Sequence, residues 1–443
     1  MRIRFFNALI MTMEEGCEIF PGEVWTRDDR IDAVIKAENC GEKSDPSTAG
    51  DCAEKQAWDR EIDCQGNLLM PGFKDAHTHS SMTFLRSYAD DLPLHDWLQK
   101  KIFPMEERLD EEAIYSFGRL AILEYLTSGI TGICDMYLRP KAMAQVCADL
   151  GMRCTLISGL NDFSSSLEKV EEEFESLNRF DPLVRYSMGF HAEYTCSKAL
   201  LQGLSELAHA KKAPVFMHLS ETKQEVEGCK ERYGMTPPAF LDSLGLFDFG
   251  GGGYHCVHVT DEDLELMKAR GVAAITNPAS NLKLASGIAP VAEFLRRGIL
   301  VAIGTDGPAS NNCLDFFRET FLVSALSKVK EEDPSSMDAL DVLKMATVNG
   351  AKVMGFADND VIAPGKYADL IMIDLQQPNM MPKHNIAKNL IYSGSKSNVK
   401  MTMIAGRILY ENGIFYTSAS RDEIYEDCEK KLKKMGITTT WNI

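Results

Sequence analysis

Residues 68–79 read LLMPGFKDAHTH, an apolar run that ends in two histidines separated by one residue. The run is short, bounded by polar residues and apolar without strict alternation, which is typical of a strand buried on both faces. Seven more runs of this kind follow. They are GITGICDM (129–136), RCTLISGL (153–160), VRYSMGFH (184–191), PVFMHLSE (214–221), GGGYHCVHV (251–259), VAAITNPAS (272–280) and LVAIGTDGP (300–308). They predict a set of parallel strands.

Amphipathic segments lie between these runs. In residues 109–129, Ile114, Phe117 and Ala121 recur at helical spacing, and residues 197–212, 260–271 and 290–298 show the same pattern. Strands that alternate with helices over roughly 250 residues are the pattern of a (β/α)₈ barrel. The sequence therefore predicts an α/β fold with a TIM barrel over residues 68–358.

The two ends of the chain differ from this middle part. Residues 1–67 and 359–418 contain short alternating runs, such as DLIMIDL, that are typical of antiparallel strands. We expect the two segments to pair into one small, β-sandwich-like domain. Residues 39–60 are polar and rich in turn formers, which indicates an exposed insertion, and residues 419–443 form a charged helical tail.

Composition and charge limit the classes of function. The 443 residues contain 47 Lys and Arg against 65 Asp and Glu, a net charge of −18 that repels phosphate backbones and anionic lipids. We expect neither nucleic acid nor membrane as a partner. The N-terminal residues do not show the pattern of a secretory signal, so we expect none, and we expect no membrane span because no run of about 18 apolar residues occurs.

The twelve cysteines are scattered and form no C-x-x-C pair. Cys40, Cys52 and Cys64 are equally spaced, which is compatible with a metal site or disulfides, but free thiols in and beside a polar insertion explain them more simply. The expected compartment is the reducing cytoplasm.

Chemically capable side chains follow the predicted strands at their C-terminal ends, where a barrel of this kind builds its active site. They are His77, His79, His191, His218, Glu221, His255 and Asp306. His77 and His79 are two residues apart, so both imidazoles point to the same side of a strand. With His218 and Asp306 they make a three-histidine, one-aspartate ligand set that leaves a position open for water.

Each of these residues alone has an ordinary explanation. A strand-end histidine is usually a satisfied polar residue, and an aspartate before glycine is usually a turn former. Four such residues at the ends of the first, fifth and eighth strands favour one divalent metal ion instead. Zn²⁺ suits the set best, while Fe²⁺ and Mn²⁺ are also compatible with it.

Several stretches together resemble the amidohydrolase superfamily, and within it the methylthioadenosine and S-adenosylhomocysteine deaminases and their triazine-hydrolase relatives. The resemblance rests on the order and spacing of PGFKDAHTHSSMTFLRSYADDLPLHDWLQKKIFPMEERL, MHLSETKQE, HCVHVTDED, TNPASNLKLASGIAPV, GTDGPASNN and IAPGKYADLIMIDL. It spans nearly the whole chain and implies the same four metal ligands.

The resemblance also implies a reaction and a role for each catalytic residue. The reaction is hydrolytic removal of ammonia from the amino-bearing carbon of a purine-like ring by metal-activated water. Glu221 would carry a proton from that water to a ring nitrogen. His255 and Asp306 would orient the water and stabilise the tetrahedral intermediate. His258, which lies three residues after His255, is expected to be structural.

Four further residues are predicted to contact the substrate. By the resemblance, His191 matches a histidine that hydrogen-bonds the purine ring, and Glu106 matches a carboxylate that accepts both ribose hydroxyls. Trp97 either lines the pocket or packs within a helix. Ser158 stands where homocysteine-binding relatives carry an arginine, and no arginine follows before Arg179. We therefore expect adenosine, 5′-deoxyadenosine or methylthioadenosine rather than a substrate with a free carboxylate.

Other functions stay open at this point. A deaminase or dechlorinase of another N-heterocycle, such as guanine, a pterin or a triazine, would share the scaffold. A binuclear ring-opening enzyme is disfavoured because His191 stands where such enzymes carry a carboxylated lysine. A non-catalytic metal-binding barrel is the alternative from a different class, and a metal assay would distinguish it. Relatives often associate, so a homo-oligomer is also expected.

Overall fold

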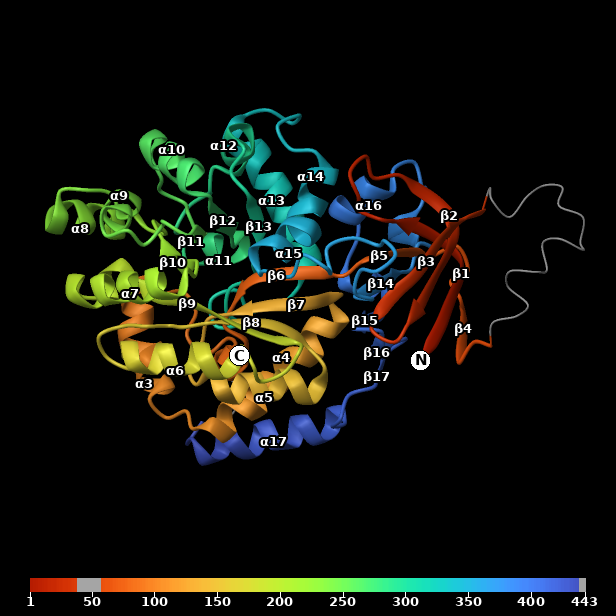
Figure 1. The fold of residues 1–443 in the computed structure, drawn as a ribbon, viewed down its shortest axis with the longest axis horizontal. Helices are drawn as coiled ribbons and strands as arrows, with labels where there is room; N and C mark the ends of the chain where they lie inside the picture. The colour runs from red at the N-terminus through yellow and green to blue at the C-terminus, as the bar shows by residue number, and fades with distance from the viewer. Residues whose placement is uncertain (38–56, 438–443) are drawn as a thin grey trace, which may run out of the picture.

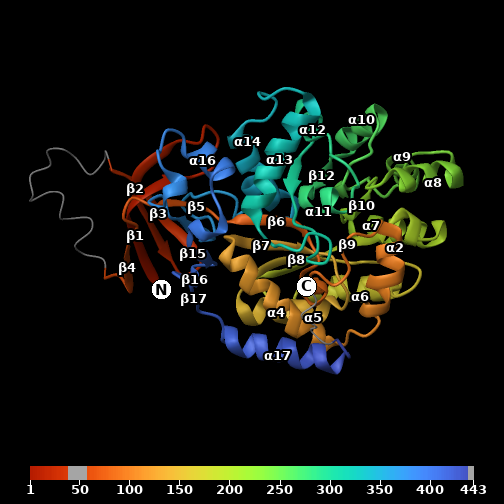
Figure 2. The same ribbon diagram turned by 180° about the vertical axis from the view of Figure 1, so that it is seen from behind.

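The computed structural model describes residues 1–37 and 57–437. A barrel of strands wrapped by helices occupies most of the molecule, and a separate sheet lies at one side of it (Figure 1). The red N-terminal strands and the blue C-terminal strands lie side by side in that sheet. Figure 2 shows the same arrangement from behind. The predicted fold class is confirmed. Of the predicted insertion, residues 39–56 lie outside the described part of the chain.

The barrel is built from eight strands within the described residues, hydrogen-bonded in the order of the sequence. They are β6 (Phe73–Thr78), β7 (Ile130–Asp135), β8 (Arg153–Ile157), β9 (Val184–Ala192), β10 (Val215–Leu219), β11 (Gly251–His255), β12 (Val272–Thr276) and β13 (Val301–Ile303). All neighbouring pairs are parallel. A parallel bridge between Thr78 and Asp306 joins the first strand to the chain just after the last one.

Burial explains the composition of these strands. All six residues of β7 are buried, as are all six of β6 and all five of β10. Such a strand faces side chains of the barrel interior on one side and helices on the other, so it needs apolar residues at successive positions. The few polar residues concentrate at the C-terminal ends, and this concentration sets the position of the site.

Helices cover the outside of the barrel. They are α4 (Glu111–Thr127), α5 (Pro140–Leu150), α6 (Leu167–Leu177), α7 (Lys198–Lys211), α8 (Lys223–Tyr233), α9 (Pro237–Ser243), α10 (Asp261–Arg270), α11 (Pro278–Lys283), α12 (Val291–Arg297), α13 (Phe316–Glu331), α14 (Ala339–Lys344) and α15 (Gly350–Val353). In α4, Asp110 caps the first turn by accepting the Ala113 N–H at 2.7 Å. Ile114, Phe117 and Ala121 are buried, as their spacing predicts.

Between β6 and α4 the chain forms short helical segments over the C-terminal end of the barrel. They are η2 (Ser80–Leu85), α2 (Leu94–Trp97), η3 (Leu98–Ile102) and α3 (Phe103–Glu106). Arg86 ties this connection down by an ion pair with Glu124 of α4. The connection supplies one wall of the cavity described below.

The two chain ends pair in one continuous sheet, in the order β17-β16-β15-β14-β5-β1-β2-β3, with β4 beside β1. Its strands are β1 (Arg2–Met11), β2 (Ile19–Arg27), β3 (Arg30–Lys36), β4 (Arg60–Asp63), β5 (Leu68–Pro71), β14 (Leu370–Ile373), β15 (Val399–Ile404), β16 (Arg407–Glu411) and β17 (Ile414–Phe415). The predicted pairing of both chain ends in one small β-domain is confirmed. The strands of this predicted sandwich-like domain all belong to one continuous sheet. The domain limits at residues 67, 358 and 418 remain a proposal, and β5 lies in this sheet.

The last described helix, α17 (Arg421–Lys434), packs along α4 at the lower edge of the barrel in Figure 1. Ser116 and Arg119 of α4 both contact the Asp427 carboxylate. Between α14 and the last strands lies α16 (Ile386–Tyr392). None of the described helices combines the length and the apolar character needed to cross a bilayer.

Candidate active site

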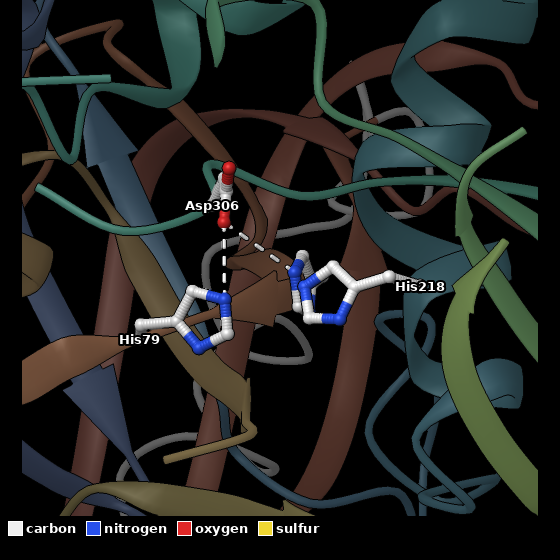
Figure 3. Close-up of side chains that lie close together, drawn as sticks. His79, His218 and Asp306 are labelled. Atoms are coloured by element: carbon white, nitrogen blue, oxygen red, sulfur yellow. Dashed lines mark ion pairs between the residues drawn. The ribbon is translucent and has the colours of Figure 1, made fainter. Parts of the chain in front are cut away.

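Four side chains converge at the C-terminal end of the barrel. The ligand atoms of His77, His79, His218 and Asp306 all lie within 4.8 Å of one another. The Nε2 atom of His79 lies 3.2 Å from Asp306 Oδ1, and that of His77 lies 3.5 Å from the same oxygen. Figure 3 shows the Asp306 carboxylate close to the imidazoles of His79 and His218, with a dashed line marking its contact with His79. This grouping matches the predicted ligand set, and it can hold a divalent ion.

Backbone carbonyls orient two of the imidazoles. Nδ1 of His218 lies 2.7 Å from the His191 carbonyl oxygen, and Nδ1 of His79 contacts the Met136 carbonyl oxygen. A carbonyl can only accept, so each Nδ1 carries the proton and each Nε2 keeps a lone pair for a ligand. His77 is fully buried, and neither of its ring nitrogens has a hydrogen-bond partner among the described residues. A metal ion is a fitting partner for one of these nitrogens, and Nε2, which lies on the side of Asp306 Oδ1, is the one nearest another ligand of the cluster.

Burial also prepares the ligands electrostatically. It lowers the pKa of His77 to about 3 and, with the neighbouring histidines, holds the pKa of His218 well below 6.5. Burial alone would raise the pKa of Asp306, but contact with His77 and His79 holds that pKa well below its usual range. For His79 burial opposes the charge, and the contact with Asp306 outweighs it and raises the pKa. Metal binding needs neutral imidazoles and an ionised carboxylate, so His77, His218 and Asp306 are already in the binding form, and a metal ion would displace the proton that Asp306 favours on His79.

The backbone around Asp306 fits tightly. Its N–H donates to the His77 carbonyl oxygen at 2.9 Å. A Cβ on Gly304 would lie 2.4 Å from Asn277 Oδ1 and 2.7 Å from the His77 carbonyl oxygen, so only glycine fits there. Asp306 has φ +59°, and His255 has φ +70°. Left-handed conformations at residues other than glycine cost energy and cluster at functional sites.

Glu221 and His255 lie beside the ligand cluster, at the ends of β10 and β11. The Oε2 atom of Glu221 lies 3.9 Å from Nε2 of His255, and both side chains are almost fully buried. Backbone N–H groups of Ser220 and Glu221 donate to the buried carboxylate of Glu225 at 2.6 and 2.8 Å. This anchoring holds the turn that carries Glu221.

A cavity of about 660 Å³ opens onto the cluster. The predicted residues that line it are His79, Trp97, Glu106, His191, His218, Glu221, His255 and Asp306. His77 lies beneath this wall, stacked on Tyr254 with ring centroids 3.6 Å apart. Ser158 is not among the described residues that line the cavity. Its hydroxyl donates to the Gly189 carbonyl oxygen and accepts the Gly189 N–H at 2.8 Å.

Two predicted substrate residues have informative surroundings. Burial raises the pKa of Glu106, and the nearby Tyr137 hydroxyl opposes that effect. Burial lowers the pKa of His191 to about 4, so its ring is neutral at neutral pH and can both donate and accept. Its Nδ1 lies 3.2 Å from the Thr195 hydroxyl. Trp97, predicted either to line the pocket or to pack within a helix, does both, since it lines the cavity and is buried.

The structure adds wall residues that the sequence argument missed. Tyr137 and Arg139 follow β7, and Phe163 and Lys169 follow β8. In the sequence, the only indication that these residues line the site was their position after the C-terminal ends of predicted strands. Arg139 and Lys169 correct the expectation that a substrate carboxylate would meet no cation, because both line the cavity. That expectation rested on the stretch around Ser158, whereas Arg139 directly precedes α5 and Lys169 lies in α6.

The fold and this site define a metal-dependent hydrolase of the (β/α)₈ class. A model of the amidohydrolase family matches residues 68–409, and the chain belongs to that family.

Two similar sequences agree with this assignment. A 5′-deoxyadenosine deaminase of Methanopyrus kandleri is 38% identical over 98% of this chain and 99% of its own length. A 5-methylthioadenosine/S-adenosylhomocysteine deaminase of Thermoanaerobacter pseudethanolicus is 39% identical over 85% of this chain and 89% of its own. The predicted superfamily and branch are confirmed.

A solved structure is similar over nearly the whole chain. It is an adenosine deaminase of Xanthomonas campestris with bound zinc, 31% identical, with a TM-score of 0.90 over 99% of this chain and 98% of that one.

Proposed function

We propose that this protein removes ammonia hydrolytically from an adenosine-like nucleoside, with one divalent metal ion, most simply Zn²⁺. One observation carries the proposal: the Glu221 carboxylate and the His255 imidazole, 3.9 Å apart, face the four-ligand cluster inside a nucleoside-sized cavity. The zinc-bound relative and the deaminase names of the similar sequences support it.

The chain's own residues divide the work. An ion held by His77, His79, His218 and Asp306 would lower the pKa of a water molecule at the site. Glu221 takes a proton from the attacking water and passes it to the ring nitrogen beside the amino-bearing carbon. His255 and Asp306 hold the water and stabilise the tetrahedral adduct. Asp306 accepts the second proton of that water from the hydroxyl group of the adduct, and this proton passes to the amino group. The C–N bond then breaks, ammonia leaves, and a carbonyl remains on the ring.

The outer part of the cavity holds the nucleoside. His191 hydrogen-bonds the ring, and Glu106 accepts the two ribose hydroxyls. Trp97 provides an apolar wall. For the 5′ position we favour a neutral group, as in 5′-deoxyadenosine, methylthioadenosine or adenosine, because Ser158 stands where homocysteine-binding relatives carry an arginine. Arg139, whose Nε donates to the Leu109 carbonyl oxygen, is the cation that a carboxylate would meet instead. Cytoplasmic location, homo-oligomer formation and lack of a nucleic-acid partner remain predictions from the sequence.

An ammonia-release screen of purified, zinc-loaded protein tests the proposal. The panel is adenosine, 5′-deoxyadenosine, methylthioadenosine, S-adenosylhomocysteine, guanine, a pterin and a triazine. We expect the highest kcat/KM on one of the first three. A preference for S-adenosylhomocysteine would contradict the neutral 5′ group and direct attention to Arg139. Turnover of guanine, pterin or triazine alone would contradict the assignment of a nucleoside substrate. A protein that neither binds metal nor turns over any of these compounds would contradict the proposal that it is a metal-dependent enzyme.

A further inference from the structure

The loop after β12, which includes the short helix α11, contacts all three proton-handling side chains, each through a different residue. Ser286 donates to Glu221 Oε1 at 2.9 Å, and Asn281 Oδ1 lies 2.7 Å from His255 Nδ1. Ser280 donates to Asp306 Oδ2. Strand β12 itself supplies none of the ligands or proton carriers named above. Its loop therefore aligns groups that three other strands supply.

The backbone of this loop is held in place. His258 Nε2 lies 2.7 Å from the Ser286 carbonyl oxygen, so His258 donates and carries its proton on Nε2. The Ser286 N–H donates to the Asn281 carbonyl oxygen at 2.8 Å. Gly287 has φ +128°, and a Cβ there would lie 2.9 Å from Val257. His258, expected to be structural, thus has a specific structural contact, because it fixes the position of Ser286.

Charged contacts fasten the rest of the loop to its neighbours. Lys283 forms an ion pair with Asp90 of the β6–α4 connection and donates to the Ala309 carbonyl oxygen at 3.1 Å. The Ala279 N–H donates to Glu319 of α13 at 3.1 Å. Ser286 is 6% exposed and Glu221 is 5% exposed, so water competes little for the hydrogen bond between them.

We propose that Ser286 is a positioning residue that assigns different tasks to the two oxygens of Glu221. The hydroxyl of Ser286 occupies Oε1. Oε2, on the side of His255, is then the oxygen that accepts the proton from water and returns it to the ring nitrogen. Ser286 touches neither water nor ring in this scheme and acts only through Glu221. The inference rests on the proposed function, because it assumes that Glu221 transfers a proton.

Three variants of the full-length, zinc-loaded protein test this assignment kinetically. Ser286→Ala should lower kcat about 10- to 100-fold, because the Glu221 carboxylate loses the hydrogen bond that holds it in position for proton transfer. KM should be nearly unchanged, because Ser286 does not touch the substrate. Ser286→Thr keeps the hydroxyl and should restore most of kcat. Ser205→Ala removes another buried hydroxyl, one that donates to the Leu244 carbonyl oxygen far from the cluster, and should leave kcat unchanged.

A double variant separates positioning from general damage. Added to Glu221→Gln, Ser286→Ala should cause no further loss, since the group that it positions is already disabled. An equal further loss, a wild-type kcat in Ser286→Ala, or a folded Ser286→Thr as slow as Ser286→Ala would each overturn the proposal.

Crystal structures of the metal-loaded wild type, Ser286→Ala and Ser286→Thr give a readout that needs no substrate. We expect the Glu221 carboxylate to turn or become disordered in Ser286→Ala and to keep its position in Ser286→Thr. An unmoved Glu221 in Ser286→Ala would overturn the proposal even if the protein deaminates nucleosides. Conversely, a displaced Glu221 in a protein that deaminates none of them would contradict the proposed function, and with it the assignment of the two oxygens, and would support only the structural hold of Ser286 on Glu221.

Discussion

At the scale of single residues, the site depends on which atom of each side chain is already engaged. Carbonyl oxygens of Met136 and His191 engage one nitrogen of His79 and of His218 and leave the other free to bind a metal. His77 has no hydrogen-bond partner among the described residues, which fits its proposed role as a metal ligand. The residue types were predictable from H-x-H and H-x-x-E, but the choice of ligand atom depends on carbonyls from other strands.

Glu221→Gln tests the proton carrier at this scale. The amide has nearly the same shape but cannot take up a proton, so we expect kcat to fall by about 10²- to 10⁴-fold. Metal content should stay at that of the wild type, because Glu221 is not among the four clustered ligands. Steady-state ammonia release and elemental analysis of the same preparation measure both quantities.

The matched control is Glu429→Gln, an exposed carboxylate on α17. It should leave both turnover and metal content unchanged. Wild-type activity in Glu221→Gln would contradict the proton-carrier role, whereas loss of metal would show that Glu221 is a ligand.

At the scale of elements, a buried ion pair joins the barrel to the small sheet. Arg153 of β8 and Asp369, just before β14, form two hydrogen bonds at 2.7 and 3.0 Å between barrel and small sheet. Both side chains are at most 2% exposed. Asp369 also accepts the Ala405 N–H at 2.7 Å. The apolar runs in the sequence predicted the strands that carry or adjoin these two residues. No local sequence pattern could predict that Arg153 pairs with Asp369, because the two residues are far apart in sequence.

Asp369→Asn tests this pair. The change leaves the Arg153 guanidinium buried without its counter-charge, and we expect the free energy of unfolding to fall by about 3–5 kcal/mol. Urea unfolding followed by circular dichroism measures the loss.

Glu172→Gln is the matched control, because it breaks the exposed ion pair with Lys141 at 2.6 Å. It should leave the free energy of unfolding nearly unchanged, because water and salt screen an exposed ion pair. Equal losses of unfolding free energy in the two variants would show that the buried ion pair stabilises the protein no more than an exposed one.

At the scale of the whole molecule, buried carboxyl groups make stability depend on pH. Glu319 of α13 is fully buried, and burial raises its pKa to about 8 from an ordinary value of 4.5. It accepts the Ala279 N–H and an N–H of Asn311 at 2.9 Å, so it joins the loops after β12 and β13. A carboxyl with a raised pKa stabilises the folded state below its ordinary pKa and loses this contribution as pH rises through about 8.

Glu319→Gln should therefore become more favourable relative to the wild type as pH rises. Between pH 5 and pH 8 we expect the difference in unfolding free energy to shift toward the variant by about 2–4 kcal/mol, since one pKa unit is worth about 1.4 kcal/mol. Urea unfolding at four pH values measures this shift. Exposed Glu429→Gln should show a constant difference, and a constant difference in Glu319→Gln as well would contradict the raised pKa.

By itself, the sequence determined the class of the molecule. Apolar runs of strand length predicted the barrel, and polar residues at their C-terminal ends predicted the ligands, because parallel strands bring those ends to one face. Only the tertiary structure decided which neighbours complete the site. Ser286 reaches Glu221, and Arg139 and Lys169 line the same cavity, across separations in sequence that carry no periodic signal. The physical reason is that strand patterns are local, whereas contacts between loops depend on how the barrel closes.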